Sequence, residues 1–140
     1  MAEHNCIFCK IIQGEIPSYT LYEDDLFKMI LDIQPASKGH MLILPKRHAQ
    51  NLLDLGEKEE KQLLSLAKKA GKQAMLSLGA NGFHVLQNNG EAAGQTVLHF
   101  HLHIIPRYDG DDLSALQWKP LAFPLETFQN LVSELSIPLL

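Results

Sequence analysis

Short apolar runs and turn-forming residues divide the first part of the chain into segments. Runs of apolar, β-branched or aromatic residues bounded by turn residues predict four strands, at 20–23, 27–31, 40–44 and 83–87. Between about 57 and 77, apolar residues recur at three- and four-residue spacing while the lysines lie largely elsewhere. This pattern predicts one long amphipathic helix, and Gly79 stands where a C-terminal glycine is expected.

A fifth strand is predicted over 97–105, and weaker patterns predict a short helical turn at 6–13 and a terminal helix at 125–135. The order is therefore strands, one long helix, then strands. That order favours an α+β fold with an antiparallel sheet of about five strands over alternating βαβ units. No linker, repeat or low-complexity tract divides residues 1–140, so we expect a single domain.

Three histidines, His99, His101 and His103, recur at a period of two within the predicted strand 97–105. Successive side chains of a strand point to opposite faces, so these imidazoles should share one face and the apolar residues between them the other. Imidazole titrates near neutral pH, acts as nucleophile or general acid and base, and binds metals. A buried row of imidazoles therefore indicates catalysis or metal binding.

Composition narrows the class of protein. The chain is 46% hydrophobic with a formal net charge of -4, which argues against a long nucleic-acid backbone as the main ligand but leaves a small anionic ligand open. No apolar run approaches the roughly 18 residues that span a bilayer, and the first five residues are polar. We expect a soluble, cytoplasmic protein without a nucleic-acid or membrane partner.

The only two cysteines, Cys6 and Cys9, are three residues apart, so no disulfide can close a long loop. Cys-x-x-Cys is the spacing of thiolates in tetrahedral zinc sites, which need two further ligands. Two other interpretations are a pair of buried apolar thiols and a redox pair. The redox interpretation is the weakest, because no strand can precede Cys6.

The sequence His-φ-His-φ-His-φ-φ at 99–105, with φ an apolar residue, resembles the signature of the histidine triad (HIT) family. The resemblance extends over most of residues 5–107 and is closest to the Hint-type branch, including its bacterial members. Further matching segments are Cys6 to Ile11, Asp32 to Pro35, Gly39-His40, Pro45 to His48, Asn88 and Gly94 to Val97. The resemblance implies a HIT-like fold and nucleotide hydrolysis or transfer through a covalent nucleotidyl-histidine.

The resemblance also implies roles for individual residues. His101 is the nucleophile, His40 supports it, and His103 is our first choice for the leaving-group acid. The phosphate pocket is lined by His103, Thr96, Gln95 and the backbone of Gly94, Asp32 binds the ribose hydroxyls, and Asn88 lies near the leaving group. Structural alternatives exist for three of these residues: a turn acceptor for Asp32, a turn residue for Asn88 and β-branching for Thr96.

With His40, His101 and His103 assigned to chemistry, the histidines left to complete a zinc site are His4, His48, His84 and His99. Resemblance to zinc-containing relatives selects His48 and His99. They would join Cys6 and Cys9 in one structural Cys2His2 zinc per chain, and no catalytic metal is expected. The resemblance further implies a purine nucleotide substrate and a homodimer.

The leading hypothesis is hydrolysis of purine nucleoside phosphoramidates or adenylates, with AMP released through attack by His101. A dinucleoside polyphosphate hydrolase is a second hypothesis, since the same site could act on another leaving group. A metal-dependent hydrolase or metal binder using the histidine strand, and a nucleotide-binding or scaffolding protein, are hypotheses from other classes. For Trp118, in the C-terminal segment, the alternatives are packing at an interface, capping a pocket or ordinary burial, and burial is the expectation.

Overall fold

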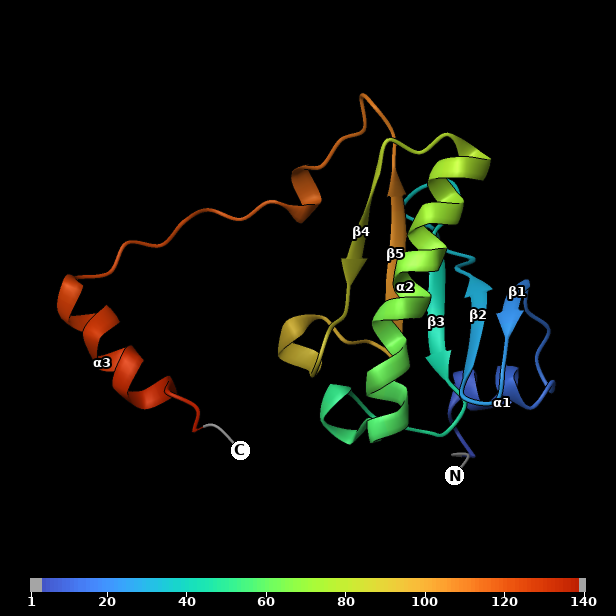
Figure 1. The fold of residues 1–140 in the computed structure, drawn as a ribbon, viewed down its shortest axis with the longest axis horizontal. Helices are drawn as coiled ribbons and strands as arrows, with labels where there is room; N and C mark the ends of the chain where they lie inside the picture. Colours follow the sequence, from blue (N-terminus) through green and yellow to red (C-terminus); the bar gives the residue numbers. More distant parts are fainter. Residues whose placement is uncertain (1–3, 139–140) are drawn as a thin grey trace.

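A computed structural model describes residues 4–138 (Figure 1). It contains a five-stranded antiparallel sheet with the strand order β1-β2-β3-β5-β4. The strands are β1 (Thr20–Glu23), β2 (Phe27–Leu31), β3 (Met41–Pro45), β4 (Gly82–Leu86) and β5 (Leu102–Arg107). The helices are α1 (Ile7–Ile12), α2 (Glu57–Leu78) and α3 (Leu125–Leu135), with 3-10 turns at Leu52–Asp54, Glu91–Ala93 and Ser114–Leu116.

Helix α2 covers one face of the sheet, where it crosses β3, β5 and β4 (Figure 1). Its buried residues, among them Leu63, Ala67 and Ala74, form one core with Met41 and Ile43 of β3. The three- and four-residue spacing predicted this buried side, and Gly79 ends the helix in the left-handed conformation, with φ 69°. The long helix and the five antiparallel strands confirm the predicted α+β class.

Helix α1 packs on the opposite face of the sheet. Phe8 and Ile11 of α1 form a second apolar cluster with Leu42 and Leu44, which alternate along β3 with the residues that face α2. By the same alternation, Leu102 of β5 joins the α2 core and His103 faces the α1 side. The α1 side of the sheet is therefore the side on which the site is built.

The predicted strand 97–105 is too long at its start, because β5 begins only at Leu102. The pairing between β3 and β5 ends at Ile43 and Leu102, although β3 itself continues to Pro45, so residues 99–101 form no ladder pairs with it. The Phe100 amide instead donates to the Ala49 carbonyl in the following loop, at 2.7 Å. His99, in a bend, and His101 therefore lie before β5, and only His103 of the triad is on a strand.

After β5 the chain leaves the sheet and runs to α3, which lies apart from the rest of the fold (Figure 1). The terminal helix was predicted, but the expected burial of Trp118 is wrong: 85% of this residue is exposed. Its segment runs outside the sheet and the two helices that pack on it, so no core is available to cover the indole ring. Within residues 4–138, no helix is both long and apolar enough to cross a membrane.

Candidate active site and zinc site

The histidines predicted to act together do lie together, in two adjacent clusters on the α1 side. One cluster contains Cys6, Cys9, His48 and His99, and the other contains Asp32, His40 and His103. The potential ligand atoms within each cluster lie within 4.8 Å of one another. The ring of His101 lies 5.0 Å from that of His103, measured between centroids, and the nucleophile proposed from the sequence thus borders the second cluster.

In the cysteine cluster, the ligand atoms surround a common point. Cys6 Sγ lies 3.3 Å from His99 Nδ1, and Cys9 Sγ lies 3.3 Å from His48 Nδ1. On the other side of the His99 ring, Nε2 is 2.9 Å from the Pro45 carbonyl. A carbonyl only accepts, so Nε2 carries the proton and Nδ1 presents a lone pair to the two sulfur atoms.

The charges in this cluster also suit a metal. Burial is the main cause that lowers the pKa of His99 to about 4, so its ring is neutral at pH 7, as a ligand must be. Burial also raises the pKa of the Cys6 thiol, an effect that a divalent cation would reverse by stabilising thiolates. Two cysteine sulfur atoms and two imidazole nitrogens within 4.8 Å of one another form a donor set that fits zinc.

The backbone fixes the tautomer of His101. Its Nδ1 lies 2.8 Å from the carbonyl oxygen of His99, so Nδ1 carries the proton and donates. Nε2 then carries a lone pair and is a potential nucleophile. The ring of Phe8 meets that of His101 edge-on, with centroids 5.1 Å apart, and restricts its rotation.

A hydrogen-bond chain fixes the tautomers of His40 and His103. The Ala36 amide donates to His40 Nδ1 at 2.9 Å, so the His40 proton is on Nε2. That N–H lies 2.9 Å from His103 Nδ1 and donates to it, which leaves the His103 proton on its own Nε2. A metal at His40 Nε2 would displace this proton, which Nδ1 cannot accept while it is bonded to the Ala36 amide. This second cluster is therefore organised as a hydrogen-bond chain, not as a metal site.

Burial keeps both of these histidines neutral. It is the largest cause lowering the pKa of His40, partly opposed by Asp32, whose Oδ2 is 3.6 Å from His40 Nε2. Burial, with the neighbouring His101 and His40, lowers the pKa of His103 to about 4. A neutral imidazole N–H is a good hydrogen-bond donor but a weak acid. This favours the binding of a phosphate oxygen by His103, and both that role and its role as leaving-group acid stay predictions.

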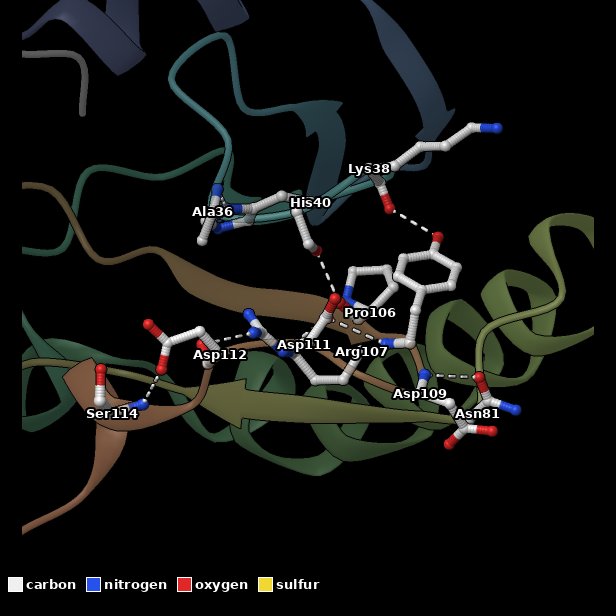
Figure 2. A network of polar contacts seen from close by, with 12 residues as sticks. Ala36, Lys38, His40, Asn81, Pro106, Arg107, Asp109, Asp111, Asp112 and Ser114 are labelled. Atoms are coloured by element: carbon white, nitrogen blue, oxygen red, sulfur yellow. Dashed lines mark hydrogen bonds and ion pairs between the residues drawn. The ribbon is translucent and has the colours of Figure 1, made fainter.

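The turn that presents Ala36 to His40 is held to the end of β5 (Figure 2). Ser37 Oγ donates to the Pro106 carbonyl at 2.6 Å, and the Tyr108 hydroxyl donates to the Lys38 carbonyl at 2.8 Å. Gly39 completes the turn with φ 89°, a conformation that other residues rarely adopt. These anchors were missed in the sequence, because contacts between residues 69 and 70 positions apart leave no local signal.

A pocket of about 360 Å³ opens beside His101 and His103. Asp32 and Thr96, both predicted to bind nucleotide, also line it. The rest of its wall is largely apolar and was not predicted, since such residues look like ordinary core in the sequence: Ile7, Phe8, Ile11, Ile16, Ile30, Leu31, Leu42 and Val97.

The remaining predicted residues lie in or near the loop before the triad. The Gln95 side chain braces this loop, because it accepts from the Gly90 amide and donates to the carbonyls of Gln50 and Val97. Gly94 is adjacent to Asn88, since a Cβ at Gly94 would lie 3.7 Å from Asn88 Nδ2. Gln95, Gly94 and Asn88 do not line the 360 Å³ pocket, and their nucleotide contacts stay a prediction.

Asp32 accepts a turn hydrogen bond and also lines the pocket. Its Oδ1 accepts from the Gln34 amide at 2.8 Å, as the turn-acceptor alternative expected. Its other carboxylate oxygen faces His40, and the residue lines the pocket. The turn bond orients the carboxylate and does not exclude a hydroxyl ligand, because a carboxylate can accept several hydrogen bonds.

Comparison with known proteins places this geometry in a family. The adenosine 5'-monophosphoramidase hnt1 of Schizosaccharomyces pombe is 39% identical over 132 residues, covering 94% of this chain and 96% of that one. The adenylylsulfatase HINT3 of Arabidopsis thaliana is 42% identical over 113 residues, covering 81% of this chain and 57% of that one.

Solved structures agree with this similarity. A HIT family protein from Bacillus anthracis is 41% identical, covers 94% of each chain and has a TM-score of 0.84. A Zn-bound histidine triad family protein from Mycobacterium smegmatis is 40% identical, covers 79% of this chain and 80% of that one, and has a TM-score of 0.75. The HIT domain model itself matches residues 13–110, and the chain belongs to the HIT family.

Proposed function

We propose that this chain is one HIT domain that hydrolyses purine nucleoside phosphoramidates or related adenylates at the α-phosphorus and releases AMP. The observation that carries the proposal is the bond from His101 Nδ1 to the His99 carbonyl, which leaves a lone pair on Nε2 beside the pocket. The names of the similar hnt1 and HINT3 proteins, a monophosphoramidase and an adenylylsulfatase, support hydrolysis of a nucleotide.

The proposed reaction has two displacements. His101 Nε2 attacks the α-phosphorus, the bond from phosphorus to the leaving nitrogen breaks, and the leaving amine keeps the electron pair and takes a proton from solvent. The ring becomes positively charged, and the His99 carbonyl stabilises that charge through Nδ1–H. Water then attacks phosphorus, the bond to Nε2 breaks, and water's proton returns to solvent as AMP leaves.

Each of the surrounding residues binds a different part of the proposed substrate. The Nε2–H of His103 donates to a phosphate oxygen, where negative charge increases in the transition state. The free oxygen of Asp32 accepts from the ribose hydroxyls. The residues of α1, β2 and β3 in the pocket wall are apolar, so they contact the base without hydrogen bonds. This predicts little discrimination between purines.

We further propose that Cys6, Cys9, His48 and His99 hold one structural zinc ion. When bound, zinc would supply a fixed connection between α1, the loop after β3 and the residue whose carbonyl orients His101. The M. smegmatis relative described as Zn-bound supports this assignment. No step of the proposed reaction uses the metal.

The proposed function is tested by AMP release from an adenosine phosphoramidate. His101→Ala removes the nucleophile, so we expect kcat to fall by at least about 1,000-fold. Acid-labile, alkali-stable radiolabel from an α-phosphorus-labelled substrate should be trapped on the unaltered protein and not on the variant. Phosphorus bonded to a histidine nitrogen has this stability, whereas a phosphate ester does not.

His84→Ala is the matched control, because His84 lies on β4 and does not line the 360 Å³ pocket. It should keep both turnover and trapping. Unchanged turnover in a folded His101→Ala protein would reject the proposed nucleophile. Turnover without any trapped label, under conditions that stop the second step, would instead favour direct attack by water.

A further inference from the structure

The two cysteines of the proposed zinc site differ in their access to solvent. Cys9 is buried, with 1% of the residue exposed, whereas Cys6 is only half-buried. A second pocket, of about 490 Å³, opens beside Cys6 and His48. Thr96 and Val97 are among the residues that line both this pocket and the 360 Å³ pocket, so the two are neighbours. A small molecule in solvent can therefore reach Cys6, but not Cys9.

The start of α1 holds the two sulfur atoms close together. Cys6 is the N-cap of α1, and its Sγ accepts from the Cys9 amide at 3.3 Å. Cys9 is the third residue of the helix, and the side chain at that position lies next to the side chain of the N-cap. The two sulfur atoms are within 4.8 Å of each other. A disulfide between them needs only local rotation of the two side chains.

We propose that Cys6 and Cys9 form a site of reversible oxidation by peroxides, at which formation of their disulfide releases the zinc ion. This inference rests on the proposed zinc site. A thiol that coordinates a metal is deprotonated, and the thiolate is the nucleophilic form of cysteine. The arrangement of a redox enzyme, in which the cysteine pair follows a strand, is absent from residues 4–138. The pair is therefore a sensor of oxidants and not the centre of an oxidoreductase.

The oxidation has two steps. Cys6 Sγ attacks one oxygen of hydrogen peroxide, the O–O bond breaks and hydroxide leaves, so that Cys6 becomes a sulfenic acid. Cys9 Sγ then attacks Cys6 Sγ, the S–O bond breaks, a second hydroxide leaves and the S–S bond forms. Two electrons pass from the two thiolates to the peroxide. With two protons from solvent, the two hydroxides become water.

The disulfide removes both anionic ligands from the metal. His48 and His99 remain, and two neutral imidazoles are too few for a closed tetrahedral zinc site. Zinc should then dissociate, and α1 loses its connection to the sheet through the metal. Phe8 of α1 contacts the ring of His101, with centroids 5.1 Å apart, and lines the 360 Å³ pocket. Oxidation should therefore weaken the binding of substrate in that pocket.

The disulfide should be easy to reduce. It would close a loop of only four residues, so it restricts the unfolded chain very little and adds little stability. The half-buried Cys6 also stays open to attack by an external thiol. Accessible disulfides of this kind are typical of regulation, whereas structural disulfides resist reduction. Treatment with a dithiol and zinc should therefore restore the reduced, metal-bound protein.

Peroxide treatment of the zinc-loaded full chain tests the proposal with two readouts that do not depend on activity. A chromogenic chelator measures the released zinc. Mass spectrometry of the denatured chain measures the loss of two hydrogen atoms and locates the bridge between Cys6 and Cys9. We expect one zinc ion released for each disulfide formed, and both changes should be reversed by dithiothreitol with added zinc.

A disulfide that leaves zinc bound, zinc release without a disulfide, or no reaction with peroxide would overturn the proposal. A reduced chain that binds no zinc would reject the zinc site itself, and this inference with it. Methionine oxidation does not imitate the expected result, because dithiothreitol does not reduce methionine sulfoxide.

Paired leucine variants test the route by which peroxide reaches Cys6. Leu98 lines the 490 Å³ pocket and is 54% exposed, so Leu98→Trp should narrow the pocket and slow disulfide formation several-fold. Leu53→Trp is the control, because Leu53 is 89% exposed and lies outside this pocket, and its rate of oxidation should be that of the unaltered protein. Equal rates in the two variants would contradict the proposed access to Cys6.

Kinetics of AMP release connect the oxidation to the proposed function. We expect the oxidised chain to show a KM raised about tenfold, with a smaller change in kcat, and recovery after dithiothreitol and zinc. An unchanged KM in the oxidised chain would reject the effect on substrate binding. If the reduced chain does not hydrolyse the substrate at all, the proposed function fails, while zinc release and disulfide formation still decide the present proposal.

Discussion

Backbone groups, rather than other side chains, determine where three of the site histidines carry their protons. The Pro45 carbonyl fixes His99, the His99 carbonyl fixes His101, and the Ala36 amide fixes His40. His103 follows from His40 through one further bond. Adjacent imidazoles on one surface therefore present different groups: a lone pair on His99 Nδ1, a lone pair on His101 Nε2 and an N–H on His103 Nε2.

His103 gives a prediction at this scale. His103→Leu removes the N–H donor, and we expect kcat to fall by about 100-fold with a smaller change in KM. His103→Gln should recover part of that loss, because its amide can accept from His40 Nε2–H and donate to phosphate. Steady-state kinetics of AMP release measures both variants.

The pH profile separates a donor from an acid. With a pKa of about 4, His103 is neutral from pH 6 to pH 8, so the rate should not titrate with this residue in that range. If His103→Gln removed a step from the pH profile between 6 and 8, His103 would be acting as the acid and the donor role would be wrong.

At the scale of elements, α1 is shared by both halves of the site. Cys9 and the half-buried Cys6 before it belong to the cysteine cluster, while Phe8 and Ile11 form part of the pocket wall. A helix of six residues has little stability of its own. Its position over the pocket should therefore depend on the metal.

Cys9→Ser tests this dependence. We expect the variant to lose its zinc equivalent, to lose amide-exchange protection over residues 7–12, and to raise KM about tenfold, or roughly 1.4 kcal/mol of binding, with a smaller effect on kcat. Metal analysis, hydrogen exchange and kinetics measure the three effects.

Lys10→Ala, one residue further along α1, serves as the control and should bind zinc normally. Loss of zinc without any change in exchange or KM would show that α1 is held by its apolar contacts alone.

The sequence predicted the elements well where periodicity was long or turns were clear, as for α2 and the β1–β2 hairpin. It failed at residues 99–101, where the alternation continues but the pairing with β3 has ended, because alternation reports side-chain direction and not backbone pairing. In the cysteine cluster, the spacing of Cys6 and Cys9 predicted two ligands, whereas only the resemblance to zinc-containing relatives selected His48 and His99. The Ala36 amide and the Tyr108 hydroxyl could not, since any residue has an amide and their contacts depend on the fold.

At the scale of the whole molecule, the free energy of unfolding should depend on the buried histidines. His103 has a pKa of about 4 when folded and about 6.5 when unfolded, so between these values only the unfolded chain binds its proton. Its contribution to stability is complete above pH 6.5 and is lost as the pH falls towards 4.

His103→Gln should make this pH dependence shallower, by up to about 1 kcal/mol per pH unit after allowance for solvent screening. Urea unfolding of both proteins between about pH 4.5 and pH 8 measures the difference. This range includes the pH at which the imidazole of the unfolded chain titrates. Zinc release at acid pH affects both proteins alike. Parallel curves would mean that the ring is not buried as described.

The backbone origin of the His99 and His101 tautomers has a consequence for changing the specificity of the protein. Main-chain carbonyls stay in place when nearby side chains are exchanged, whereas a histidine oriented by an aspartate loses its orientation with that one residue. In the proposed enzyme, the apolar positions Ile16, Ile30 and Leu31 of the pocket wall can thus be redesigned for other bases without altering the carbonyls that orient His99 and His101. Under that proposal, substrate recognition could be changed while the reactivity of His101 is retained.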